Sequence, residues 1–99
     1  MEKQPSEIIP CTVDYTKVIP AGDTLLETSS VVVKDAEDED VTEDIVDVGP
    51  TVDSTGKKLT IRVIAGEDGE DYSITLYGRT EQGYLFESDI KLMVREQTP

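Results

Sequence analysis

Acidic side chains are the most numerous groups in this sequence that could take part in chemistry. The chain of 99 residues has 22 aspartates and glutamates against 9 lysines and arginines, which gives a net charge of −13. Two acidic runs, residues 35–40 and 67–71, could supply the several oxygen ligands that a calcium ion requires. Neither run matches the Asp-x-Asp/Asn-x-Asp/Asn-Gly loop with its distant glutamate. We therefore expect both runs to be solvated loops, and we predict no metal site and no cofactor.

Catalytic constellations are difficult to assemble from these residue types. The sequence contains no histidine, which removes Ser-His-Asp and Cys-His catalysis and most zinc sites. Cys11 is the single cysteine, so it can form neither an intrachain disulfide nor a thiolate zinc site. A reactive thiol needs a nearby cation, and only Lys17 is close in sequence, so we expect Cys11 to be a small core residue. We predict no catalytic residue and a protein that is not an enzyme.

Length and composition limit the fold to one small domain without a deep substrate cavity. A chain of 99 residues, 36% of them hydrophobic, has enough apolar surface for two packed sheets and little more. The charge of −13 opposes binding to nucleic acid or to an anionic membrane, and it permits basic protein surfaces as partners. No segment approaches the about 20 apolar residues of a membrane span. Residues 1–10 lack the apolar run of a signal peptide.

Alternating apolar residues organise the C-terminal half of the chain. Residues 59–63, 72–80 and 84–94 place apolar or small side chains at every second position, which is typical of strands with one buried face. Glycine-bearing turns separate the three segments, so we predict an antiparallel three-stranded meander. Tyr77, Leu85 and Met93 fall outside the face that this alternation buries. They are either scattered surface residues or an apolar protein-contact patch.

The N-terminal half carries weaker signals. Residues 1–10 are polar and contain two prolines, so we expect an extended arm, with a frayed terminus as the alternative. Strands are predicted at residues 11–18 and 24–33, followed by an acidic loop and a strand near 45–48. A helix over residues 38–46 is the less favoured alternative for the acidic stretch, because valine and isoleucine are only middling helix formers.

The predicted strands fit one domain over residues 11–96. Short strands at regular spacing, with a turn between each pair, favour two stacked sheets. The predicted fold class is therefore all-β, an immunoglobulin-like β-sandwich of about six or seven antiparallel strands. The disulfide and the buried tryptophan of antibody domains are both missing, so only the architecture is implied.

A set of turn and strand residues carries a resemblance to a known family. The set comprises Asp14-Tyr15, Gly22-Asp23-Thr24-Leu25, Gly66, Gly69 and Tyr72, Thr80 and Gly83, Ser88 and Val94. In these residues the chain resembles small immunoglobulin-like structural proteins of tailed bacteriophages, from the gene region of head and decoration proteins. The match is best from Leu59 onward. The acidic residues 35–47 depart from the short loop of that family.

The resemblance implies a non-enzymatic structural protein located in the virion and made in the host cytoplasm. It implies a head decoration or capsid-stabilising protein that binds the major capsid protein or another virion protein, and that can form a homo-oligomer. It carries over no catalytic residue. The alternative function is an immunoglobulin-like adhesion or carbohydrate-binding module of a phage tail or a bacterial surface. Such modules present exposed aromatic side chains to sugars.

Overall fold

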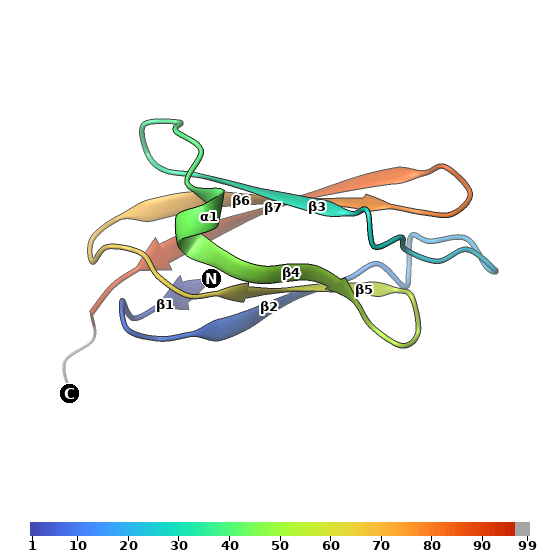
Figure 1. Ribbon diagram of the computed structural model, residues 1–99, viewed down its shortest axis with the longest axis horizontal. Helices are drawn as coiled ribbons and strands as arrows, with labels where there is room; N and C mark the ends of the chain where they lie inside the picture. Colours follow the sequence, from blue (N-terminus) through green and yellow to red (C-terminus); the bar gives the residue numbers. More distant parts are fainter. Residues whose placement is uncertain (97–99) are drawn as a thin grey trace.

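Two stacked β-sheets form the body of the protein (Figure 1). The computed structural model describes residues 1–96, and these form seven strands and one short helix. The larger sheet has the order β1-β7-β6-β3 and the smaller sheet has the order β2-β5-β4. The strands are β1 (Glu2–Lys3), β2 (Ile9–Asp14), β3 (Ser30–Lys34), β4 (Val46–Val52), β5 (Lys58–Val63), β6 (Asp71–Arg79) and β7 (Leu85–Val94). The prediction of an all-β chain folded into two sheets is confirmed.

The predicted three-stranded meander is wrong in one respect. β6 and β7 form the expected hairpin, but β5 pairs with β2 and β4 in the other sheet. Residues 64–70 therefore connect the two layers instead of making a hairpin turn, and both Gly66 and Gly69 adopt positive φ angles there. The alternation shows which face of β5 is buried. It does not show which strand pairs with β5, so the sequence could not assign β5 to one sheet or the other.

The core lies between the sheets and is built from alternate residues of each strand. Val33, Ile61, Ile74 and Leu92 come from four different strands, and all are fully buried in one cluster. Each such side chain contributes about 1.5–3 kcal/mol relative to exposure. Cys11 belongs to the same cluster, as expected, and burial raises the pKa of its thiol. The apolar residues that recur at every second position in the sequence are thus the ones that pack between the two sheets.

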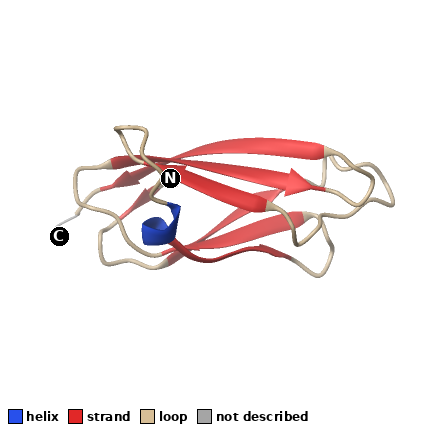
Figure 2. Cartoon of the chain, turned by 45° about the horizontal axis from the view of Figure 1, so that its top comes forward, coloured by secondary structure: helices blue, strands red, loops and turns tan. Residues whose placement is uncertain are grey.

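The N-terminal half differs from the predicted boundaries because turns replace parts of the expected strands. β2 ends at Asp14, and the amides of Val18 and Ile19 then donate to the carbonyl of Tyr15, which turns the chain. β3 likewise occupies only the last part of the predicted segment 24–33. The single-turn helix α1 (Thr42–Ile45) lies between β3 and β4, so the acidic stretch combines the expected loop with a fragment of the alternative helix. Figure 2 shows this helix between the two layers.

The first residues take part in the larger sheet. β1 pairs with β7 in parallel, so the expectation of antiparallel strands fails for this pair. The amides of Met93 and Arg95 donate to the carbonyls of Met1 and Lys3. Lys3 is 2% exposed, and its ammonium group donates to the carbonyl of Gln4 at 2.7 Å. Residues 1–10, expected as an extended arm, therefore contain β1, a turn and the start of β2.

The substitution Ile74→Ala tests whether the even-numbered face of β6 is the core. Because Ile74 is fully buried, its truncation should lower the free energy of unfolding by about 2–5 kcal/mol. The matched control is Ser73→Ala on the exposed face of the same strand, which should change the free energy by less than about 0.5 kcal/mol. Urea unfolding measures both. Equal losses in the two variants would contradict the assignment of faces.

Candidate protein-binding surfaces

Asp23 ties three loops together at one end of the sandwich. Its side chain is fully buried, and its Oδ1 accepts hydrogen bonds from the amides of Thr24 at 2.9 Å and Gln82 at 3.1 Å. The ammonium group of Lys57 donates to the carbonyl oxygen of the same aspartate. The connection 15–29, the turn before β5 and the β6–β7 hairpin thus share one polar centre.

The electrostatics of Asp23 favour the ionised carboxylate. Burial alone raises the pKa of the Asp23 carboxyl, but the Thr80 hydroxyl, the amides of Gln82 and Thr24, and the charge of Lys57 together hold its pKa below its ordinary value. Its Oδ2 has no partner at ordinary hydrogen-bond geometry. The sequence placed Asp23 only among the turn and strand residues that carry the family resemblance, because a buried role for an aspartate leaves no periodic signal.

Backbone contacts reinforce this end of the molecule. The amide of Leu25 donates to the carbonyl of Gly56 at 2.8 Å, and the amide of Glu81 donates to the carbonyl of Thr24 at 3.0 Å. A Cβ atom at Gly56 would lie 2.7 Å from Thr24 Cγ2, so only glycine fits there. The three loops are therefore fixed relative to one another and can present a defined surface.

Exposed apolar side chains gather where β7 begins. Tyr84 is 51% exposed and Leu85 is 53% exposed. The ring centroid of Tyr84 lies 6.4 Å from that of Phe86, which in turn lies 6.0 Å from the buried ring of Tyr15. This aromatic row anchors Tyr84 to the core while leaving about half of its surface available for contact.

The predicted patch of Tyr77, Leu85 and Met93 is not one surface. Leu85 pairs with Arg79 at one end of the β6–β7 hairpin, whereas Met93 pairs with Asp71 at the other end. Eight residues of an antiparallel strand span about 27 Å, so Met93 lies far from Leu85. Tyr77 pairs with Glu87, so it lies diagonally across from Leu85 and not directly opposite it.

The two acidic runs have local structural roles. In the loop after β3, carboxylate oxygens of Asp35, Glu37 and Glu39 lie within 4.8 Å of one another. Asp35 Oδ1 accepts the amides of Glu37 at 2.9 Å and Glu39 at 3.0 Å, which shapes the loop. In the second run, Asp71 pairs with Arg95 at 2.8 Å. Within residues 1–96, the carboxylates of the second run do not form a comparable cluster.

The other three strand edges of the sandwich are each partly covered or interrupted. The edge of β3 is covered, because the amide of Val41 donates to the carbonyl of Val33 at 2.8 Å and Thr42 Oγ1 accepts the amide of Val33. β4 has two register shifts and contains Pro50. On the free edge of β2, Pro10 has no N–H group to offer. Covering, bulges and prolines are the usual means of preventing strand addition.

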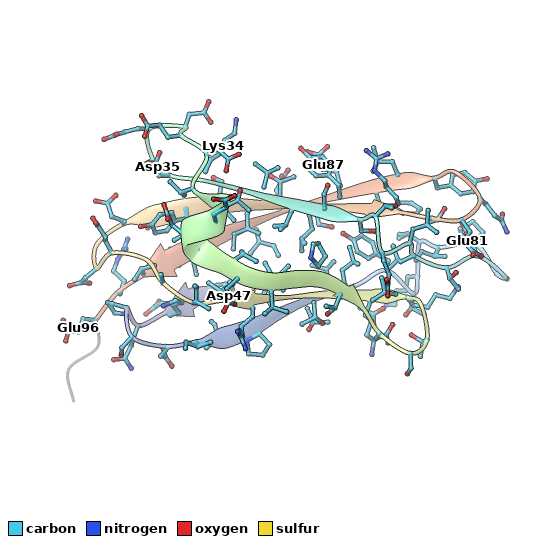
Figure 3. All side chains as sticks on the ribbon, viewed as in Figure 1. Lys34, Asp35, Asp47, Glu81, Glu87 and Glu96 are labelled. Carbon is cyan, nitrogen blue, oxygen red and sulfur yellow. The ribbon has the colours of Figure 1, made fainter. Side chains whose placement is uncertain are left out.

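The edge of β7 is open over its first half. β1 pairs with β7 only at Met93 and Val94. Within the described residues, no hydrogen bond reaches the amide or carbonyl groups of Leu85, Glu87 and Asp89. Glu87 projects from the outer face of the sheet (Figure 3). Sequence reasoning missed this surface, because an edge is defined by the topology and not by the residues of one strand.

The comparison with protein families identifies the class of the chain. Residues 3–93 match the family described as podophage GP4 fiber-tail adaptor protein gp77. The chain belongs to this family. It is therefore a bacteriophage structural protein located in the virion, as the sequence resemblance implied. A search of curated proteins found no match.

The family match refines the earlier expectations. A family of structural adaptors agrees with the prediction that the chain is not an enzyme. The match does not extend to a head location, to decoration of the capsid or to binding of the major capsid protein. No helix in the described part of the chain is long and apolar enough to cross a membrane.

The substitution Asp23→Ala tests the polar centre of the loops. It leaves the amides of Gln82 and Thr24 without the buried carboxylate that accepts their hydrogen bonds, so the melting temperature should fall by several degrees. The control Glu27→Ala removes an exposed carboxylate from the same connection and should leave the melting temperature nearly unchanged.

Acid should remove the contribution of Asp23 to stability. Because the folded-state pKa of Asp23 lies below its unfolded value of about 3.9, its contribution is present above that pH and is lost as the pH falls through the folded pKa. Melting curves from pH 7 to pH 2 should show the difference between the native protein and Asp23→Ala shrinking below about pH 4. A difference that stays constant down to pH 2 would contradict this account.

Proposed function

We propose that this protein is a fibre–tail adaptor, a non-enzymatic component that holds a tail fibre on the tail of a podophage. The observation that carries the proposal is the match of residues 3–93 to the fibre–tail adaptor family. Its partners are then other virion proteins, a fibre on one side and a tail component on the other.

The physical properties of the chain support an adaptor. The sandwich is elongated, with principal extents of 46 × 29 × 20 Å, so its two ends can contact different partners. The end built around Asp23 carries the exposed Tyr84 and Leu85. The charge of −13 favours partners with basic surfaces and predicts association that weakens as salt rises.

The strand order supports the immunoglobulin-like class. In immunoglobulin domains the strands are lettered in chain order, with B, E and D in one sheet and C, F and G in the other. If β2 to β7 are lettered B to G, the orders β2-β5-β4 and β7-β6-β3 become B-E-D and G-F-C, which match this arrangement. We also propose that residues 11–96 act as a single domain and that residues 1–10 dock onto it, through β1 on β7 and through the start of β2 on β5.

Two other functions remain as alternatives. A head decoration protein would bind the major capsid protein, and a carbohydrate-binding module would stack aromatic rings on sugars. Tyr84 is the best exposed aromatic side chain in the described residues, whereas Tyr15 and Tyr72 are buried. A single half-exposed ring gives little support to a carbohydrate-binding function. Loss of glycan binding in Tyr84→Ala would be the test of that alternative.

Deleting the gene from the phage tests the proposed function. The expected particles have filled heads and tails but no fibres, and they regain fibres when the protein is supplied from a plasmid. Mass spectrometry of separated heads and tails should find the protein with the tails. A protein found on the heads, with fibres retained in the deletion, would support decoration and contradict the adaptor.

A further inference from the structure

We infer that the open edge of β7 binds an extended, basic segment of a partner virion protein, which adds to the larger sheet as a further strand. This inference rests on the proposed function, because it specifies how an adaptor holds one of its partners. The site is the segment from Leu85 to Asp89, where β7 has a neighbour on one side only.

The hydrogen bonds at both ends of β7 show which backbone groups face the open edge. The amides of Met93 and Arg95 donate to β1, whereas the amide of Val94 donates to Glu70 on the β6 side. At the other end, the carbonyl of Tyr84 accepts the amide of Thr80, again on the β6 side. The register between β6 and β7 is continuous from Arg79↔Leu85 to Asp71↔Met93.

Successive residues of a strand direct their N–H and C=O groups to opposite sides. The odd-numbered residues Leu85, Glu87 and Asp89 therefore direct both groups to the open edge, while the even-numbered residues pair with β6. This row can accept a strand by the backbone hydrogen bonding that is general to strand addition. β1 already shows that the far end of the same row accepts a neighbouring strand.

The side chains of β7 define the chemistry of the incoming strand. Glu87 and Asp89 lie on the outer face, beside Tyr77 and Thr75 of β6. Asp89 accepts a hydrogen bond from the Thr75 hydroxyl at 2.9 Å, and neither acid forms a salt bridge within the described residues. Lysine or arginine at alternate positions of the partner would face both carboxylates, because opposite charges on adjacent strands stabilise pairing.

The remaining contacts of the edge are apolar. Leu85 lies on the same face as the two acids, so the position of the partner facing it should be apolar. On the inner side, Phe86 and Ile90 are only partly buried, and apolar side chains between the basic residues would cover them. The partner strand thus alternates basic and apolar residues, with an apolar residue near the start of β7.

A second copy of this chain fits the edge poorly. Two copies of β7 paired about a two-fold axis at Glu87 would place Glu87 opposite its own copy and Leu85 opposite Asp89. Like charges in directly opposite positions destabilise strand pairing, and each chain also carries a net charge of −13. The charge of the edge therefore selects a basic partner over self-association.

Amide hydrogen exchange, read residue by residue by NMR, tests the inference directly. The intact protein is mixed separately with purified fibre protein, with fibreless tails and with heads of the same phage. In the free protein, the amides of Leu85, Glu87 and Asp89 should exchange rapidly, while those of Phe86 and Ser88 are protected by β6. Binding should slow exchange at the three odd-numbered amides by at least about tenfold.

Two variants separate backbone pairing from charge. Glu87→Pro removes an N–H group that faces the edge while leaving the pairing with β6 intact, and it should abolish binding in a protein that still melts cooperatively. If proline disturbs the fold, Glu87→Lys provides the second test and should weaken binding by about tenfold or more. Its control, Glu43→Lys, makes the same charge change on the exposed surface of α1 and should bind like the native protein.

The outcomes distinguish this inference from the proposed function. Binding to fibre or tail with protection of the three amides supports both. Binding to fibre or tail without that protection overturns the inference and leaves the adaptor function standing. Binding only to heads with protection supports the edge and contradicts the adaptor, and binding to none of the three contradicts both. A dimer in sedimentation that Glu87→Pro dissolves would overturn the choice of a basic partner.

Discussion

An open β-sandwich buries one face of each sheet but cannot pair all of its edges, and this constraint shapes the molecule. The inner faces need little more than alternating apolar residues such as Ile61 and Ile74. The edges need a separate solution, because unpaired backbone groups recruit other strands. Here the acidic loop and α1 cover β3, bulges interrupt β4 and Pro10 lies on the free side of β2. The start of β7 has no cover, bulge or proline, and only its acidic side chains oppose pairing with a like-charged strand.

The two ends of the sandwich are built differently. At one end the buried carboxylate of Asp23 is the common polar contact of three loops, and it lies beside a small apolar cluster of Tyr15, Ile19, Leu25 and Leu59. At the other end, the N-terminal strand β1 joins β7 and buries Lys3. Hydrogen bonds thus connect the loops at one end, and strand pairing holds the N-terminus at the other.

The sequence predicted those features that one strand encodes by itself. β6 and β7 were placed within a residue or two, because Tyr72 to Thr80 and Phe86 to Val94 alternate without interruption. The same pattern could not assign β5 to its sheet, since a period of two identifies a buried face but not the strand beside it. β1 is too short to show a period, and Asp23 resembles any aspartate in a turn. The open edge depends on the strand order, which no single segment contains.

The family resemblance in the sequence led to the right class of protein, a bacteriophage structural protein, but the family match does not support the head location that it implied. Glycine turns and the Gly22-Asp23-Thr24-Leu25 segment are features of the fold, and the structure explains them through Asp23 and its loop contacts. Location on the head or the tail depends on surface contacts, which those residues do not determine. The family match supports the tail location that we propose, and the open edge of β7 is the attachment surface that we infer.

A cryo-electron microscopy reconstruction of the intact phage tail would test the central claim most directly. We expect this protein at the junction between fibre and tail, with a strand of a neighbouring protein paired along Leu85 to Asp89 and basic side chains facing Glu87 and Asp89. A reconstruction that places the protein at that junction with the same edge facing solvent would contradict the claim.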